Sequence, residues 1–215
     1  MQRILKGLIA ALLLVAIAGA RQRSHADSTP GEFDYYLLNL AWAPAFCAVH
    51  AGNASSSECD PAHHFGFVVH GLWPENNDGS YPQNCGSASP VSHAIVQRMI
   101  TIMPSAGLIQ HEWMRHGTCS GLAATDYFNQ IETAFRKVQI PAEYRNASRP
   151  ISTGPSEIEH EFAKANNAPA GAFRVVCSQS ELEVEVCLTK DLQFRDCGER
   201  LRDCRAAQVT FLPVR

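Results

Sequence analysis

Two short segments carry most of the side chains that could do chemistry: residues 70–74 (HGLWP) and residues 111–119 (HEWMRHGTC). Histidine has the side chain whose usual pKa lies nearest neutrality, so two histidines can divide the roles of general acid and general base. An arginine fork suits the oxygens of a carboxylate or a phosphate. The segments therefore predict proton transfer around a phosphate group. The candidate residues are His70, His111, Glu112, Arg115 and His116.

The second segment would place its polar residues on one side of a helix. If residues 109–116 are helical, Glu112 and His116 share one face. His111 and Arg115 then form a second pair of the same spacing beside them. The zinc-binding pattern HExxH also uses one helical face, but the pattern here is HExxxH. The extra residue turns the second histidine by about 100°, so we expect no metal site and no cofactor.

The chain begins like an exported protein. Two basic residues, Arg3 and Lys6, precede a short run of small and apolar residues, which is typical of a cleavable secretory signal. We expect residues 1–20 to be removed, with a second candidate cleavage point after residue 26; an uncleaved membrane anchor is the alternative. Residues 27–215 are expected to form one catalytic domain, secreted or periplasmic, monomeric and without a membrane segment.

The charge balance restricts how the protein could bind a polyanion. The formal net charge is −3, and loss of Arg3 and Lys6 with the signal makes it −5. This acidic balance argues against a broad basic surface for nucleic acid. Any polyanion must be bound locally, or at a pH at which histidines are protonated. With 46% hydrophobic residues, the domain is long enough to bury a core.

The chain has eight cysteines, all after the expected signal. An even number in an exported chain implies disulfides. Spacing favours one pair within a short loop region, one pair that links the ends of the two segments, and a nested arrangement of the last four cysteines. The expected bridges are Cys47–Cys59, Cys85–Cys119, Cys177–Cys204 and Cys187–Cys197. Four cysteines allow three pairings, so the last two bridges are a choice among alternatives.

Hydrophobic patterns predict helices in the middle of the chain and strands toward both ends. Strands are expected at residues 34–42, 65–70, 173–177, 182–188 and 208–212. Helices are expected at residues 90–103, 126–138 and 155–166, and a loop at residues 74–86. This order favours an α+β domain, with a central antiparallel sheet and helices packed against it, over a doubly wound fold.

HGLWP followed by HEWMRHGTC resembles the paired active-site segments of the ribonuclease T2 family. The resemblance extends to the aromatic first strand that runs into WAPAFC, to GTCSG, and to the C-terminal cysteine cluster. It implies an α+β fold and a secreted, metal-independent endoribonuclease whose partner is an RNA substrate. It implies cleavage of single-stranded RNA by 2′-oxygen attack, through a 2′,3′-cyclic phosphate to 3′-phosphate ends. It also implies that Cys85–Cys119 is a family disulfide.

The resemblance assigns a role to each candidate residue. His70 matches the general acid that protonates the departing 5′-oxygen, and His116 matches the base that takes the 2′-hydroxyl proton. Glu112 matches the carboxylate that assists this pair, and His111 matches the histidine that contacts the phosphate. Arg115 stands where the family usually has lysine. It keeps the positive charge, but its fork is larger and flatter than the ammonium group of lysine. The rate of reaction and the geometry of the site are therefore in question, but the class of reaction is not.

Two further residues are candidates for contact with a base. Trp73 matches a residue that stacks on a base in part of the family; a core tryptophan is the alternative. Glu75 stands where an acidic or amide residue often reads a base; a solvated loop carboxylate is the alternative. We expect Trp113 to lie in the core.

Two other functions remain as alternatives. One is a catalytically weakened, exported RNA-binding relative of the same fold, which the presence of all three histidines and the glutamate disfavours. The other is a phosphatase or phosphodiesterase of another class, which would not depend on the 2′-hydroxyl of its substrate. For the ribonuclease we expect greatest activity between about pH 4.5 and 6.5, around the usual pKa of histidine.

Overall fold

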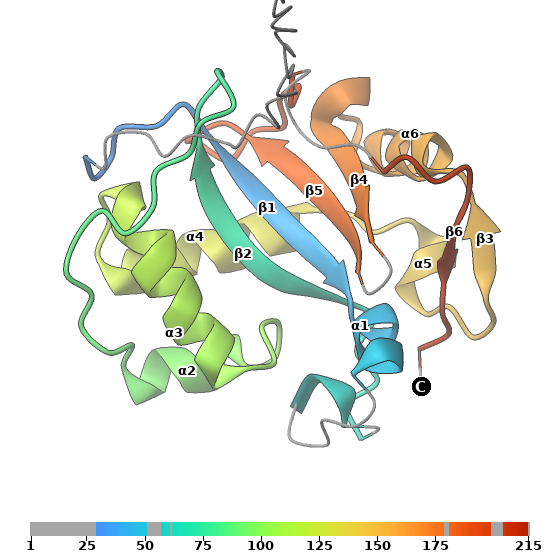
Figure 1. Ribbon diagram of the computed structural model, residues 1–215, viewed down its shortest axis with the longest axis horizontal. Coiled ribbons are helices and arrows are strands. Elements are labelled where there is room, and N and C mark those ends of the chain that lie inside the picture. The colour runs from blue at the N-terminus through green and yellow to red at the C-terminus, as the bar shows by residue number, and fades with distance from the viewer. Residues whose placement is uncertain (1–28, 51–56, 61, 179–180, 199–203, 215) are drawn as a thin grey trace, which may run out of the picture.

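The computed structural model describes residues 29–50, 57–60, 62–178, 181–198 and 204–214 (Figure 1). The expected signal, with both candidate cleavage points, lies outside the described residues. Among the described helices, none combines the length and the apolarity that crossing a lipid bilayer requires.

A four-stranded antiparallel sheet forms the centre of an α+β fold, as the sequence predicts (Figure 1). The strands lie in the order β2-β1-β5-β4, so the first strand of the chain is flanked on both sides. These strands are β1 (Tyr35–Trp42), β2 (Phe67–Glu75), β4 (Phe173–Cys177) and β5 (Leu182–Leu188). A second, two-stranded sheet pairs β3 (Ile151–Thr153) with β6 (Val209–Phe211).

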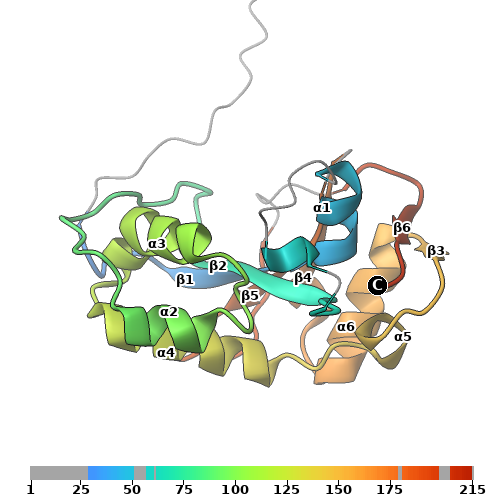
Figure 2. The same cartoon turned by 90° about the horizontal axis from the view of Figure 1, so that it is seen from below.

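Helices surround this sheet, and Figure 2 shows α4 and α6 below it with α1 on the opposite side. The α-helices are α1 (Ala43–Val49), α2 (His93–Met99), α3 (Ala106–Arg115), α4 (Ala124–Lys137), α5 (Ala142–Arg145) and α6 (Pro155–Asn166). Short 3-10 turns are η1 (Ser57–Cys59), η2 (Gly117–Ser120) and η3 (Ala170–Ala172).

The two faces of the central sheet differ in chemistry. Alternate side chains of β1 and β5, such as Leu40 and Val184, are fully buried in the main hydrophobic core with Ile131 of α4 and Phe162 of α6. Because side chains alternate along a strand, the intervening residues face the other way. This second face bears polar side chains that are nevertheless buried, including Asn39. A buried polar face requires partners for its polar groups, and it is here that the candidate site lies.

Pairing with β1 extends β2 beyond the predicted strand. The sequence predicts a strand that ends at His70 and a loop that begins at Pro74, whereas β2 continues to Glu75 and pairs with Tyr35. Glycine and proline are poor strand residues, but β2 is an edge strand, where proline is tolerated. Contacts along the whole of β1 therefore override local propensity. The helix predicted at residues 90–103 is shorter in the structure, where α2 spans His93–Met99. Its start is fixed by Ser92, whose side chain accepts a hydrogen bond from the N–H of Ile95.

The structure joins all eight cysteines in the four expected pairs: Cys47–Cys59, Cys85–Cys119, Cys177–Cys204 and Cys187–Cys197. The bridge from Cys85 to Cys119 connects the loop after β2 with η2, which follows α3. A backbone hydrogen bond from the N–H of Asn84 to the carbonyl of Arg115 (2.9 Å) lies beside it. The two motif-bearing elements are thus linked at one end by a covalent bond and a hydrogen bond.

Candidate active site

A β-bulge in β2 brings the first motif onto one face of the sheet. Asn39 pairs with Gly71 and Leu40 pairs with Val69, so His70 is an extra residue with no partner on β1. In a regular strand, residues three apart point to opposite faces, and His70 would be separated from Trp73. A bulge re-aims the side chains around it. As a result the rings of His70 and Trp73 lie 5.5 Å apart, edge to face at 76°.

Helix α3 brings the second motif to the same place. Ser105 caps its first turn by accepting a hydrogen bond from the N–H of Leu108. Ile109 and Trp113, four residues apart, are buried in the core and fix how the helix is rotated. Glu112 then lies on the inner side and is 1% exposed. The burial of Trp113 in the core confirms the position that the sequence predicts for it.

Trp73 connects the two motifs. Its Nε1–H donates a 2.7 Å hydrogen bond to Oε2 of Glu112, and its ring stacks on His116 at 5.3 Å and 29°. Gly71 is required for this contact, because a Cβ at that position would lie 2.1 Å from Oε2 of Glu112. The bulge, the glycine and the tryptophan together determine where Glu112 and His116 lie relative to His70.

His116 follows the last residue of α3 and is suited to remain neutral. Its backbone N–H donates to the carbonyl of Glu112 at 3.0 Å, and the residue is largely buried. Burial, then the positive charges of Arg115, His111 and His70, lowers the pKa of His116 to about 3. A neutral imidazole can accept a proton, so His116 can act as a general base over a wide pH range.

His70 is suited to remain protonated. Burial, the largest single influence, lowers its pKa, but a hydrogen bond to Glu183 and the charges of Glu183, Glu112 and Glu181 outweigh it, so the pKa of His70 is raised. The opposite shifts of His70 and His116 divide the roles of acid and base between two residues of the same type.

The remaining candidates form the polar surroundings of this pair. Burial raises the pKa of Glu112 to about 7, although the charge of His70 and the hydrogen bond from Trp73 act against it. Burial, with the charges of Arg115 and His70, lowers the pKa of His111. His111 is exposed and Arg115 is half-buried, four residues apart on α3. The positive charge of Arg115 thus acts on both His116 and Glu112.

Glu75 is placed differently from the sequence-based expectation. It lies at the end of β2 and is 1% exposed, so its side chain gives an incoming base almost no surface to contact. It is paired with Tyr35 of β1. The role of Glu75 in contacting a base stays a prediction.

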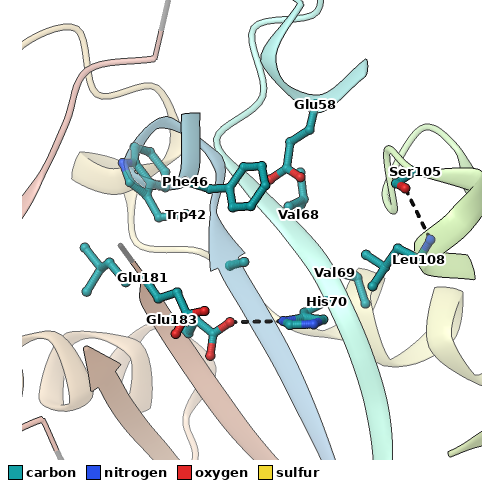
Figure 3. A pocket seen from close by; sticks show the side chains of 12 residues that line it. Trp42, Phe46, Glu58, Val68, Val69, His70, Ser105, Leu108, Glu181 and Glu183 are labelled. Carbon is teal, nitrogen blue, oxygen red and sulfur yellow. Dashed lines mark hydrogen bonds and ion pairs between the residues drawn. The ribbon is translucent and has the colours of Figure 1, made fainter. Parts of the chain in front are cut away.

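A pocket of about 210 Å³ opens beside His70 (Figure 3). Val68 and Phe46 contribute apolar surface, while Glu58, Glu181 and Glu183 contribute carboxylates. In Figure 3 Glu183 reaches His70 across the sheet. Glu183 lies outside both sequence motifs and is not among the residues that the sequence predicts for the site. Within the described part of the chain, no group of three or more histidine, cysteine, aspartate or glutamate side chains is arranged to hold a metal ion.

The fold and this site together define a class: an α+β protein with a histidine pair set for acid–base chemistry. The model of the ribonuclease T2 family matches residues 33–197. This chain therefore belongs to the ribonuclease T2 family.

Individual relatives agree with the family match. A ribonuclease of Aeromonas hydrophila is 40% identical over 112 residues, covering 52% of this chain and 49% of that protein. Ribonuclease DdI of Dictyostelium discoideum is 28% identical over 222 residues, covering 92% of each. The RNase-related protein from Calystegia sepium shares the fold, with a TM-score of 0.69 at 22% identity, covering 85% of this chain and 98% of that one. The match to the Aeromonas protein, and a match to a probable ribonuclease of Haemophilus influenzae at 32% identity over 120 residues, span only about half of those proteins' length.

Proposed function

We propose that this protein is an endoribonuclease that cleaves single-stranded RNA through a 2′,3′-cyclic phosphate, without a metal ion. The observation that carries the proposal is that His70 and His116 both contact the ring of Trp73, with ring separations of 5.5 and 5.3 Å. Their pKa values are shifted in opposite directions, as a reaction that needs one acid and one base requires.

In the proposed first step, neutral His116 takes the proton of a 2′-hydroxyl, and the 2′-oxygen attacks the adjacent phosphorus. The bond from phosphorus to the 5′-oxygen breaks, and protonated His70 gives its proton to that oxygen. The products are a 2′,3′-cyclic phosphate and a 5′-hydroxyl end. In the second step neutral His70 takes a proton from water, the water oxygen attacks phosphorus, the bond from phosphorus to the 2′-oxygen breaks, and His116 gives that oxygen the proton that it took in the first step. This leaves a 3′-phosphate end.

The neighbouring side chains would stabilise the charge that develops on phosphate. Arg115 and His111 contribute positive charge, and fixed charges directed at a transition state are a large part of catalysis. Glu112, held by Trp73, assists the histidine pair. The part of the Trp73 ring that His116 and Glu112 leave uncovered is a surface on which a base can stack.

The decisive experiment uses two matched oligonucleotides in EDTA. One has ribose throughout, and the other has a 2′-methoxy group at every position. We expect the oxidised protein to cut the first at full rate, with cyclic phosphate and then 3′-phosphate ends, and to leave the second intact. Loss of activity on chelation, or equal cleavage of both, would contradict the proposal. Binding of both without cleavage would instead support the RNA-binding alternative.

We expect kcat/KM for RNA to follow a bell-shaped pH profile with its maximum between about pH 4.5 and 6.5. Activity rises as His116 loses its proton, and its pKa of about 3 places this limb at low pH. Activity falls as His70 loses its proton, and its raised pKa moves that limb upward. The limbs report macroscopic values for the coupled set. A profile that climbs steadily to pH 8 would refute the acid role of His70.

We also propose that the protein is exported and monomeric. The N-terminal pattern of the sequence supports export, because a basic start followed by a short apolar run is typical of a secretory signal. Four disulfides also fit an oxidising compartment.

A further inference from the structure

We infer that Glu183 is a positioning residue for His70: its carboxylate orients the imidazole and keeps it protonated to act on the leaving 5′-oxygen. The assignment deepens the proposed function and depends on it. Glu183 lies on β5, 113 residues from His70 and more than 60 residues beyond the second motif, and its side chain is 10% exposed. It belongs to neither sequence segment that predicts the activity.

The contact between Glu183 and His70 spans three strands. β2 and β5 both pair with β1, so the two residues are separated by about 9–10 Å of sheet, twice the usual strand spacing. Ala41 of β1 pairs directly with Glu183, and its methyl group leaves room above the sheet. Glu183 and His70 therefore meet over a small residue, with 3.1 Å between Oε1 and Nδ1 (Figure 3).

Asn39 holds the other carboxylate oxygen. Its Nδ2 donates a 2.8 Å hydrogen bond to Oε2 of Glu183, and Asn39 is fully buried. The carboxylate is therefore held at both oxygens, one by Asn39 and one by His70. A group fixed in this way can fix the ring that it contacts.

The geometry has a chemical consequence for His70. When Nδ1–H donates to Glu183, the imidazole ring is oriented and its Nε2 is directed away from the carboxylate. In the protonated ring Nε2–H is then the proton available for a leaving group. The arrangement is a carboxylate–histidine pair, in which the carboxylate stabilises the imidazolium and fixes the tautomer of the neutral ring.

Other charges also act on His70, and they need to be distinguished from Glu183. Glu181 precedes β5 and Glu58 lies on η1, and both carboxylates interact electrostatically with His70. From α3, Glu112 favours the charged form of His70. The charge interactions of His70 with His111 and His116 oppose it. Glu183 differs from all of these because its carboxylate is hydrogen-bonded to the His70 ring.

The test compares Glu183→Gln with Glu181→Gln. Each substitution removes one negative charge near His70, but only the first alters the group in contact with the ring. We expect Glu183→Gln to move the alkaline limb of kcat/KM to lower pH and to reduce kcat/KM on that limb about tenfold, the scale of one charge-assisted hydrogen bond. Near the acid limb, activity should remain close to that of the parent, and KM should change little. Glu181→Gln should move the limb much less.

NMR titration of the His70 ring gives a second readout that does not depend on turnover. We expect the His70 pKa to fall in Glu183→Gln and to change little in Glu181→Gln. If Glu183→Gln does not fold, Glu183→Asp tests the contact in another way: it keeps the charge but withdraws the oxygen from Nδ1, so we still expect the His70 pKa to fall. An unchanged His70 titration, or equal effects of both glutamine variants, would overturn the assignment.

Failure of this inference can be distinguished from failure of the proposed function. If the parent protein does not cleave RNA, the function is wrong, and the His70 titration alone decides whether Glu183 stabilises the charged ring. If the parent protein cleaves RNA and requires His70, but Glu183→Gln has the parent pH profile, the function stands and the role of Glu183 is wrong.

Discussion

Replacing His116 or His70 with alanine should lower kcat for RNA by about 10²–10⁴-fold, the usual contribution of a proton-transfer group. KM should change much less, because each group acts mainly in the transition state. Both residues contact Trp73 within the same cluster, so loss of activity alone does not separate their roles. Steady-state kinetics on a short RNA at the pH optimum provide the measurement.

A substrate with an activated leaving group separates the acid from the base. A uridine 3′-phosphodiester of p-nitrophenol releases a phenolate that needs no proton from the enzyme. His70→Ala should therefore recover most of its lost activity on this substrate, whereas His116→Ala should not, because the 2′-hydroxyl still needs a base. Recovery by His116→Ala instead would mean that the two roles are assigned the wrong way round.

Gly71→Ala should lower kcat by about 10²-fold while the protein stays folded. The added Cβ would lie 2.1 Å from Oε2 of Glu112 and 2.3 Å from Nε1 of Trp73, so the hydrogen bond between them must break or shift. A displacement of about 1 Å in a catalytic group can cost this much. Activity assays beside thermal unfolding provide the measurement.

Gly107→Ala is the matched control, because Gly107 lies in the first turn of α3. Its added Cβ would meet Oγ of Ser105 at an ordinary 3.7 Å, and alanine favours a helix over glycine. We expect unchanged kcat and equal or higher stability. Parent-like activity in Gly71→Ala would show that the link from Trp73 to Glu112 is not needed for catalysis.

Much of the fold could be predicted because its hydrophobic patterns are regular. The predicted helix at residues 155–166 coincides with α6 (Pro155–Asn166), and the predicted strands at residues 173–177 and 182–188 coincide with β4 and β5. The bulge at His70 could not be predicted. The run before it is uniformly apolar, so it has no alternation whose interruption would mark an extra residue; only pairing with β1 creates one.

Glu183 was missed for a related physical reason. In the sequence LEVEVCL, alternation indicates that Glu183 and Glu185 face water, yet they are only 8% and 6% exposed. Alternation identifies which residues share a face, but not what covers that face. The sequence feature that could have indicated Glu183 is the presence of two acidic residues in a strand whose other residues are β-branched or apolar. It becomes informative only once β5 is known to lie two strands away from His70.

The bridge from Cys85 to Cys119 makes assembly of the site depend on the redox state of its surroundings. In the entropy account of crosslinks, a loop of this length contributes roughly 3–4 kcal/mol. A newly made chain in a reducing cytoplasm would lack this bond, and β2 and α3 would be held together less firmly there. Messenger and ribosomal RNA of the producing cell would thus be exposed only to an incompletely assembled enzyme. In the proposed export, oxidation outside the cytoplasm would complete the enzyme away from the cell's own transcripts.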